Sequence, residues 1–171
     1  LNTLVFILFH IPLQIIVALL LAYFLNQKLL FRSFFRASFF MPVVISGVVI
    51  TILWQQLYGL DNGIINRSLI AMGLGRVEWL TNPKIAMVSI AIMATWKNVG
   101  LYVILFLVGL QTVPKSYYEA AEVEGATSWQ QFRFITIPAI NPTIFMVVIL
   151  STIGGFSLFI EPYIMIDGGP L

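Results

Sequence analysis

Pro114-Lys-Ser-Tyr-Tyr-Glu-Ala-Ala-Glu-Val-Glu-Gly-Ala-Thr-Ser-Trp-Gln-Gln-Phe-Arg-Phe-Ile-Thr-Ile-Pro138 is a water-compatible stretch between two long apolar runs. Ser116 with Glu119, and Ser128 with Gln131, are spaced as in the first turns of two helices. Gly125 between them is typical of a helix end. The pattern predicts a helix–turn–helix element, after which Pro138 opens the next apolar run, where a missing N–H costs little. The residues alone leave two readings open: an ordinary capped loop, or a surface that fits a groove on another protein.

The composition places this element in a membrane protein. Hydrophobic residues make up 60% of the chain and charged residues 9%, far below the roughly 25% charged residues of soluble domains. The net charge is +2 and the basic residues are scattered, so no nucleic-acid partner is expected. The chain has no cysteine, which excludes disulfides and thiolate metal sites. We expect a lipid bilayer around the chain and no metal site.

Apolar runs of about 20 residues, enough to cross a bilayer core of roughly 30 Å, predict an all-α, polytopic membrane protein with about four transmembrane helices. They cover about Leu4–Leu25, Phe34–Tyr58, Ile85–Leu110 and Ala139–Ile166. With an even number of spans, both ends of the chain lie on one side of the membrane. The connections between spans alternate between the two faces.

The distribution of basic residues favours one orientation. The face with the 114–138 element carries Lys28, Arg32, Arg36, Lys115 and Arg133. The opposite face carries Arg67, Arg76 and Lys84 in the 59–84 loop, beside Asp61 and Glu78. Cytoplasmic loops are enriched in lysine and arginine, so the 114–138 element is expected in the cytoplasm. The 59–84 loop and both ends of the chain would then be extracytoplasmic.

Glu119-Ala120-Ala121, Gly125 and the later Ile135-x-Ile137-Pro138 resemble the "EAA" loop of inner-membrane permease subunits in binding-protein-dependent ABC importers of the maltose and multiple-sugar type. Ile137 stands where that family usually has leucine, a swap that keeps volume and branching. The resemblance implies a type I importer transmembrane domain, in which this loop is the coupling helix. It assigns ATPase coupling to Glu119, Ala120, Ala121, Gly125, Ile135 and Pro138.

The same resemblance implies the partners and the extent of the domain. A cytoplasmic ATPase subunit would bind the ATP, a second and different permease chain would complete the pore, and an extracytoplasmic solute-binding protein would deliver solute. The location would be a bacterial or archaeal plasma membrane. Residues 1–171 would form one truncated transmembrane domain, because similar permeases have about six spans. One span before Leu1 and one after Leu171 are expected.

The 59–84 loop carries turn signals and a short apolar stretch. Asp61-Asn62-Gly63 is typical of a turn, and Gly73 and Gly75 are typical ends for the stretch Ile64–Met72. Trp79 is of the kind that collects at membrane interfaces. The loop is either a solvated connection or a surface-lying segment that, by the resemblance, helps to receive the solute-binding protein.

Lys97, flanked by Trp96 and Asn98, lies about half-way along the third predicted span. Charged groups in membrane spans are costly and usually face the bundle interior or a water-filled path. We interpret Trp96, Lys97 and Asn98 as lining a substrate pathway, where an indole can stack on a sugar ring. The alternatives are a lysine at a helix kink, one that snorkels, or one that pairs with a neighbouring subunit.

Two further candidate stretches are Pro42–Gly47, where proline, serine and glycine break the second span early, and Ser151–Ser157, where small residues lie within the fourth span. By the resemblance, Ser46, Gly47, Ser151 and Gly155 border the solute path, although close helix packing explains small residues equally well. His10 is a candidate proton relay, but a lone histidine without a carboxylate on its own helix is typically a buried hydrogen-bonding residue.

The Phe159-x-Glu161-Pro162-Tyr163 stretch, followed by Asp167-Gly-Gly-Pro170, resembles the carbohydrate branch of these permeases. It is expected at the extracytoplasmic end of the fourth span, and it favours a sugar as solute. The alternatives are a non-sugar solute, such as a glycerol phosphate, an amino acid or phosphate, and an ion-coupled secondary transporter that uses Lys97 and His10.

Enzyme functions have little support in the sequence. No Gly-x-Ser-x-Gly elbow accompanies the single histidine, so no catalytic residue is assigned. No Gly-x-x-x-x-Gly-Lys-Ser/Thr loop is present, so the chain is expected to bind no ATP and no other cofactor. The energy for transport must then come from a partner subunit.

Overall fold

The computed structural model describes residues 2–27 and 32–167, and all regular elements in these ranges are helical. The expected residues Lys28 and Gly168–Pro170 lie outside these ranges. In chain order the elements are α1 (Asn2–Asn26), α2 (Arg32–Val44), α3 (Gly47–Leu57), α4 (Ile64–Ala71), α5 (Ala86–Gln111), α6 (Lys115–Val123), α7 (Ser128–Gln131), the π-helical segment η1 (Phe132–Thr136), α8 (Ile137–Ala139), α9 (Asn141–Phe156) and α10 (Ile160–Ile166). The all-α prediction is confirmed.

Two helices, α1 and α5, are long and apolar enough to cross a bilayer without a break. The second predicted span is instead the pair α2 and α3, bent by 99°. Pro42 lies near the end of α2, and Ser46 has an extended backbone before α3 begins. The break that the sequence predicts within residues 42–47 is therefore confirmed, because proline and a non-helical serine divide this span into two helices.

The fourth predicted span is also broken. The helical run 128–139 meets α9 at a bend of 65°, where Pro142 lacks the N–H that would continue the ladder. A second break separates the end of α9 at Phe156 from the start of α10 at Ile160. The span count is four only if each bent pair crosses as one unit.

Helix α5 is the centre of the packing. Its C-terminal half packs with α1 and α9 in one hydrophobic cluster around Phe106 and Leu107. Its N-terminal half packs with Phe6, Ile50 and Met165 in a second cluster. Trp96, Lys97 and Asn98 lie between the residues that α5 contributes to these clusters, so the polar trio interrupts an otherwise apolar core.

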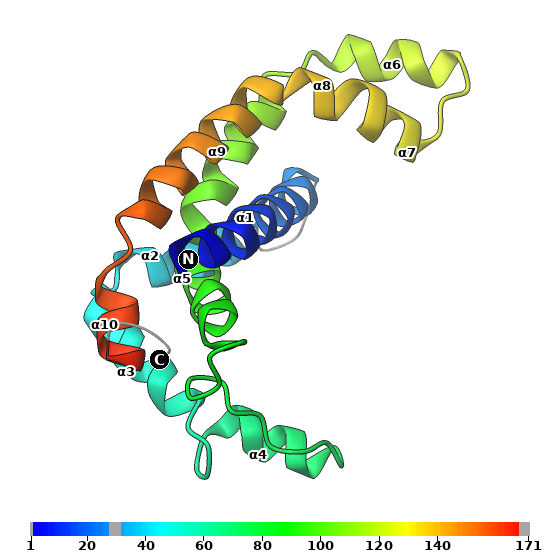
Figure 1. The fold of residues 1–171 in the computed structure, drawn as a ribbon. Helices are drawn as coiled ribbons and strands as arrows, with labels where there is room; N and C mark the ends of the chain where they lie inside the picture. The colour runs from blue at the N-terminus through cyan, green and yellow to red at the C-terminus, as the bar shows by residue number, and fades with distance from the viewer. Residues whose placement is uncertain (1, 28–31, 168–171) are drawn as a thin grey trace.

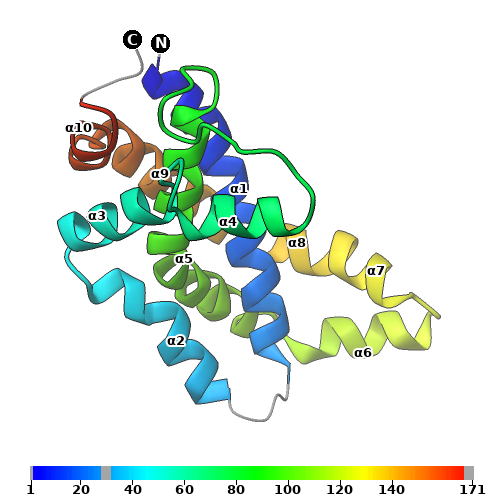
Figure 2. The same cartoon turned by 90° about the horizontal axis from the view of Figure 1, so that it is seen from below.

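The two loops that flank α5 lie at opposite ends of the molecule. Figure 1 shows the hairpin of α6, α7 and α8 projecting beyond one end of α5, with α4 beyond the other. The start of α1 and helix α10 lie on the same side in Figure 2. Asn2 and Thr3 share a small cavity with Phe159 and Pro162, which agrees with that placement.

Candidate functional site

The 114–138 hairpin turns at Gly125, as the sequence predicts. Gly125 has a φ of +78°, in the left-handed region that favours glycine. Its N–H donates to the Glu122 carbonyl oxygen at 3.0 Å, and the Ala126 N–H donates to the Ala121 carbonyl oxygen at 2.9 Å. These two bonds form a Schellman motif, which satisfies carbonyls that the end of α6 would otherwise leave unpaired.

The predicted helix starts are wrong in detail. Thr127, rather than Ser128, is the N-cap of α7, and its partner is Gln130 rather than Gln131. The Gln130 side chain accepts from the Thr127 N–H at 2.7 Å, and the Thr127 hydroxyl accepts from the Gln130 N–H at 3.4 Å. Ser116 lies inside α6, which starts after an N-cap at Pro114 without a side-chain bond. Each serine lies one or two residues too far along the chain to act as the cap.

Pro138 does not open the next apolar helix, because α8 continues directly from η1. The π-helical segment η1 precedes this proline. The long helix α9 begins only at Asn141. Pro138 thus lies on the returning arm of the hairpin (residues 128–139), whereas the sequence predicted it at the start of a membrane span.

The two arms of the hairpin enclose an open groove of about 590 Å³. Ala120 and Ala121 line it from α6, and Ile135 and Pro138 line it from the returning arm. Tyr117, Glu124, Phe134 and Ala139 complete the lining. Gly125 lines an adjoining cavity of about 350 Å³, while Glu119 is exposed on α6 outside both linings. Four residues of one sequence motif therefore meet across a single, mostly apolar groove.

The hairpin is held to the helix bundle through its returning arm. The buried Thr136 hydroxyl lies 2.9 Å from the Tyr118 hydroxyl and so joins η1 to α6. The Phe132 ring packs edge-on against Tyr23 near the end of α1, with centroids 5.2 Å apart. Large apolar side chains nevertheless remain exposed on the hairpin, namely Val123 at 91%, Trp129 at 68% and Phe134 at 68%. Exposed apolar groups gathered on one polar element are typical of a protein-binding surface.

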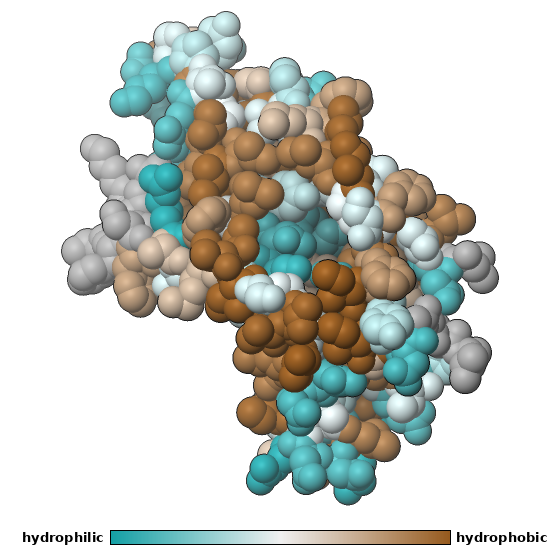
Figure 3. All heavy atoms as spheres, turned by 90° about the vertical axis from the view of Figure 1, so that its left-hand side faces the viewer, coloured by the Kyte–Doolittle hydropathy of each residue, from teal (hydrophilic) through white to brown (hydrophobic). Residues whose placement is uncertain are grey.

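Lys97 pairs with a carboxylate that the sequence analysis placed at the end of the fourth span. Its Nζ lies 3.1 Å from Glu161 Oε1 on α10, and the two side chains are 18% and 12% exposed. Gly47 at the start of α3 leaves room for the ammonium, because a Cβ there would lie 2.8 Å from Nζ. The ion pair thus joins α5 to α10 beside the start of α3. In Figure 3, hydrophilic residues lie at the floor of a hollow on the side where α3, α9 and α10 run.

The neighbours of Lys97 differ in their surroundings. Trp96 is 43% exposed, and its ring lies 5.6 Å from that of Trp54 on α3. The Trp54 indole nitrogen is buried and has no hydrogen-bond partner among the described residues. Asn98 donates to the Ala94 carbonyl oxygen of its own helix at 2.9 Å. Ser46 is exposed at the break between α2 and α3 and makes no side-chain cap bond.

Ser151 and Gly155 lie elsewhere, at the contact between α9 and α1. A Cβ on Gly155 would lie 2.9 Å from the Ile7 side chain, so the helices approach closely there. Ser151 is buried, and its hydroxyl has no partner among the described residues. His10 on the same stretch of α1 pairs through Nδ1 with the Thr95 hydroxyl at 3.0 Å and stacks on Phe6. The structure therefore brings Gly47 to Lys97, while Gly155 packs against α1.

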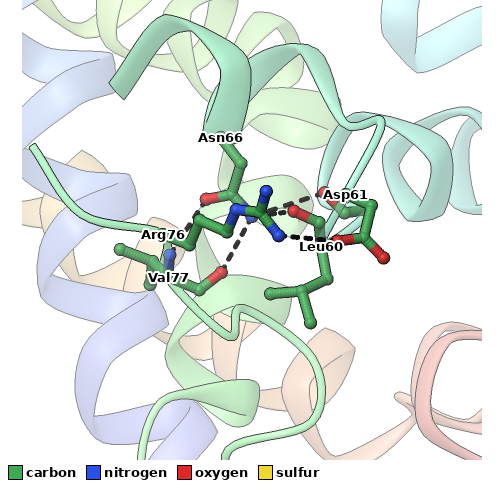
Figure 4. Close-up of polar contacts among 6 residues, drawn as sticks. Leu60, Asp61, Asn66, Arg76 and Val77 are labelled. Atoms are coloured by element: carbon green, nitrogen blue, oxygen red, sulfur yellow. Dashed lines mark hydrogen bonds and ion pairs between the residues drawn. The ribbon is translucent and has the colours of Figure 1, made fainter. Parts of the chain in front are cut away.

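The 59–84 loop is organised around Asn66, a residue that the sequence analysis did not single out. Its buried amide donates to the carbonyl oxygens of Gly59, Leu60 and Val77, and its Oδ1 accepts from the Val77 N–H and the Trp79 indole N–H, all within 3.0–3.3 Å. Figure 4 shows this amide between the chain segments at Leu60 and Val77, beside the exposed Arg76–Asp61 ion pair. The only sequence signals were a turn and glycine helix ends, which do not reveal a buried amide.

The predicted end of the apolar stretch in this loop is correct. Gly73 has a φ of +78° and follows the end of α4. The Leu74 N–H donates to the Leu69 carbonyl oxygen at 2.9 Å, as in the 114–138 hairpin. In the described residues no group of three or more histidine, aspartate or glutamate side chains has the arrangement of a metal site.

Comparison with known proteins places the chain among membrane transport components. A family model described as "Binding-protein-dependent transport system inner membrane component" matches residues 1–171. The lactose transport system permease protein LacF of Rhizobium radiobacter is 41% identical over 170 residues, which cover 98% of this chain and 57% of LacF. The arabinooligosaccharides permease protein AraP of Bacillus subtilis is 36% identical over 166 residues, 96% of this chain and 53% of AraP.

Proteins with lower sequence identity to this chain are also transport components. The trehalose/maltose permease protein MalF of Thermococcus litoralis is 32% identical over 94% of this chain and 54% of MalF. A crystal structure of a bacterial ABC transporter that imports the acidic polysaccharide alginate matches with a TM-score of 0.78 and 28% identity, over 96% of this chain and 58% of that one. The chain spans a little over half the length of these relatives.

Proposed function

Because the chain belongs to the family of binding-protein-dependent transport system inner-membrane components, we propose that it forms part of the permease of an ATP-driven ABC importer for a sugar or related carbohydrate. The permease itself is not an enzyme, and it needs no cofactor of its own. A separate cytoplasmic subunit binds and hydrolyses the ATP. The chain supplies part of the translocation path and one of the surfaces on which the ATPase acts.

The observation that carries this proposal is the groove of the 114–138 hairpin. Ala120, Ala121, Ile135 and Pro138 line it together, although the motif spreads them over both arms. Exposed Val123 and Phe134 border it with apolar surface that water does not favour. Such a groove accepts apolar side chains of a partner, and its rigid Gly125 turn can pass on the partner's movement.

Docking of the 114–138 hairpin on a cytoplasmic ATPase also sets the orientation of the chain in the membrane. The 114–138 hairpin faces the cytoplasm, the 59–84 loop lies outside, and both ends of the chain are extracytoplasmic. Described basic residues on the hairpin side include Arg36, Lys115 and Arg133, which agrees with the enrichment of cytoplasmic loops in basic residues. The membrane is a bacterial or archaeal plasma membrane, as in the relatives from Bacillus, Rhizobium and Thermococcus.

Three partners complete the importer. A cytoplasmic ATPase subunit binds the hairpin. A second and different permease chain completes the pore, and an extracytoplasmic solute-binding protein delivers the solute. The related alginate transporter has been crystallised with a pentasaccharide-bound periplasmic protein, which supports the last of these partners. Outside the membrane, the 59–84 loop that Asn66 organises is the surface available to that protein.

A carbohydrate is the solute that the relatives support, since their names specify lactose, arabinooligosaccharides and trehalose or maltose. The path runs beside Trp96, Lys97 and Asn98, with Ser46 and Gly47 at the break between α2 and α3. The exposed Trp96 ring offers a flat apolar face for a sugar ring. Ser151 and Gly155 border the path from α9 and set how closely α9 packs on α1.

The test changes the hairpin turn in the full-length permease with its partners. Gly125→Val forces a branched side chain into a left-handed conformation, which costs on the order of 1–2 kcal/mol and shifts the second arm. We expect sugar uptake and stimulation of the ATPase to be lost, while membrane insertion is unchanged. Uptake that persists in ATPase-deficient vesicles under an ion gradient alone would instead support an ion-coupled transporter.

A further inference from the structure

Lys97 and Glu161 form the one ion pair in the described residues whose two side chains are both largely buried. The other pair, Arg76–Asp61, has side chains 58% and 73% exposed. Isolated charges are costly among membrane helices, and a close opposite charge offsets that cost. The α5–α10 contact therefore presents no net charge, although it holds two ionised groups.

The pair is not sealed from the surroundings. Both side chains keep part of their surface exposed, and Gly47 covers the ammonium with backbone alone. Exposed Trp96 directly precedes Lys97 in α5, and Trp54 lies against Trp96 with an unpaired indole N–H. A flat, partly exposed aromatic face and a compensated charge pair thus lie where α3, α5 and α10 meet, beside the buried Trp54 N–H. This combination suits a polar, uncharged ring with hydroxyl groups.

We propose that Lys97 and Glu161 determine the charge of the solute that the permease accepts. As a pair they favour neutral carbohydrate and give no binding advantage to acidic sugars. Without Glu161, the Lys97 ammonium attracts a solute carboxylate; without Lys97, the Glu161 carboxylate attracts a solute ammonium. This inference rests on the proposed function, because it assigns specificity at the same path.

The experiment uses the full-length permease with its ATPase and binding partners in vesicles. Wild-type uptake is first measured for lactose, trehalose, maltose and an arabinotrioside, all neutral. Uptake of the accepted sugar is then measured in competition with a uronate-containing disaccharide and with an amino-sugar disaccharide. The variants are Glu161→Gln, Lys97→Gln and the double variant Lys97→Gln/Glu161→Gln.

We expect the uronate to compete about tenfold better in Glu161→Gln than in wild type, a modest part of the attraction between close opposite charges near a protein surface. In Lys97→Gln the amino-sugar disaccharide should instead compete better than it does in wild type. In the double variant neither charged sugar should gain over its competition in wild type, since the site again presents no net charge. The double variant can still be measured if a single variant fails to assemble.

Two outcomes overturn the inference while leaving the proposed function intact. One is unchanged competition in both single variants while wild type takes up a neutral sugar. The other is a double variant in which the uronate or the amino sugar competes as well as in the corresponding single variant, which would show that the unpaired charge does not cause the gain. If wild type takes up no carbohydrate at all, the sugar assignment and this inference fail together.

Discussion

Asn66 shows how one side chain can organise a loop. Its amide makes five hydrogen bonds in a site that water does not reach. Asn66→Ala would leave the Val77 N–H, the Trp79 indole N–H and the carbonyls of Leu60 and Val77 without the Asn66 amide, while the Gly59 carbonyl keeps the Gly63 N–H. We expect a loss of about 2–4 kcal/mol in the stability of the loop, because buried unpaired polar groups are costly. Faster proteolysis between residues 72 and 84 and red-shifted Trp79 emission would report it.

The matched control for that substitution is Asp61→Ala in the same loop. Asp61 pairs with Arg76 at 2.8 Å, but both side chains are mostly exposed. Exposed ion pairs contribute only about 0–1 kcal/mol, so this variant should leave proteolysis and emission nearly unchanged. Equal effects of the two substitutions would contradict the central role of Asn66.

At the residue scale, the sequence predicted features that depend on one backbone position and missed those that depend on a distant partner. Gly125 and Gly73 were predictable, because a positive φ at a helix end requires little besides glycine. The need of Lys97 for a partner was also predictable from its depth in a span. That the partner is Glu161 was not, since the two residues are 64 positions apart and the fourth span is broken before Glu161.

At the element scale, α2 and α5 approach closely at Gly100. A Cβ on Gly100 would meet the backbone carbonyl oxygen of Phe39, which cannot move aside as a flexible side chain can. Gly100→Ala should therefore push α2 from α5 and cost about 1–3 kcal/mol or more, as overpacking does. The thermal unfolding midpoint of the detergent-solubilised, full-length permease should fall.

Gly154→Ala is the control for that prediction. No atom lies within 4 Å of a Cβ built there, although Gly154 also lies within an apolar helix. The added methyl should leave the midpoint unchanged or raise it slightly, since alanine favours helix over glycine by about 1 kcal/mol. A fall as large as that of Gly100→Ala would contradict the prediction, because it would show that an added methyl group lowers the midpoint without a contact such as that with Phe39.

The existence of the helices and the break of the second span within Pro42–Gly47 were predictable, whereas the breaks of the fourth span were not. Hydropathy over about 20 residues located each apolar run, but it does not register one proline or one extended residue. Pro142 and Ser46 decide the bends at α9 and α3. The cap of α7 was misplaced by one position because Thr127-Ser128 offers two adjacent hydroxyls, and only the backbone conformation selects Thr127.

At the scale of the whole molecule, two surfaces lie at opposite ends of α5, with the Lys97–Glu161 pair between them. The hairpin at one end presents an apolar groove, and the Asn66-centred loop at the other presents a folded surface on which Ile64, Met72 and Leu74 are exposed. Under the proposed function, coupling to the ATPase and solute choice belong to different parts of the chain. The clearest sequence motif identifies the family, while the residues proposed to select a solute carry a much weaker signal.

The direct test of this account places single cysteines at the two ends of a full-length permease freed of other cysteines. These 171 residues contain none, so Ala120→Cys and Gly73→Cys each give one reporter here. Ala120 lines the hairpin groove, and Gly73 is exposed at the end of α4. We predict that Ala120→Cys forms a crosslink to the ATPase subunit that changes on ATP binding, while only Gly73→Cys reacts with an impermeant thiol reagent from outside. An Ala120→Cys that the outside reagent labels, or that never crosslinks to the ATPase in a transporting complex, would contradict it.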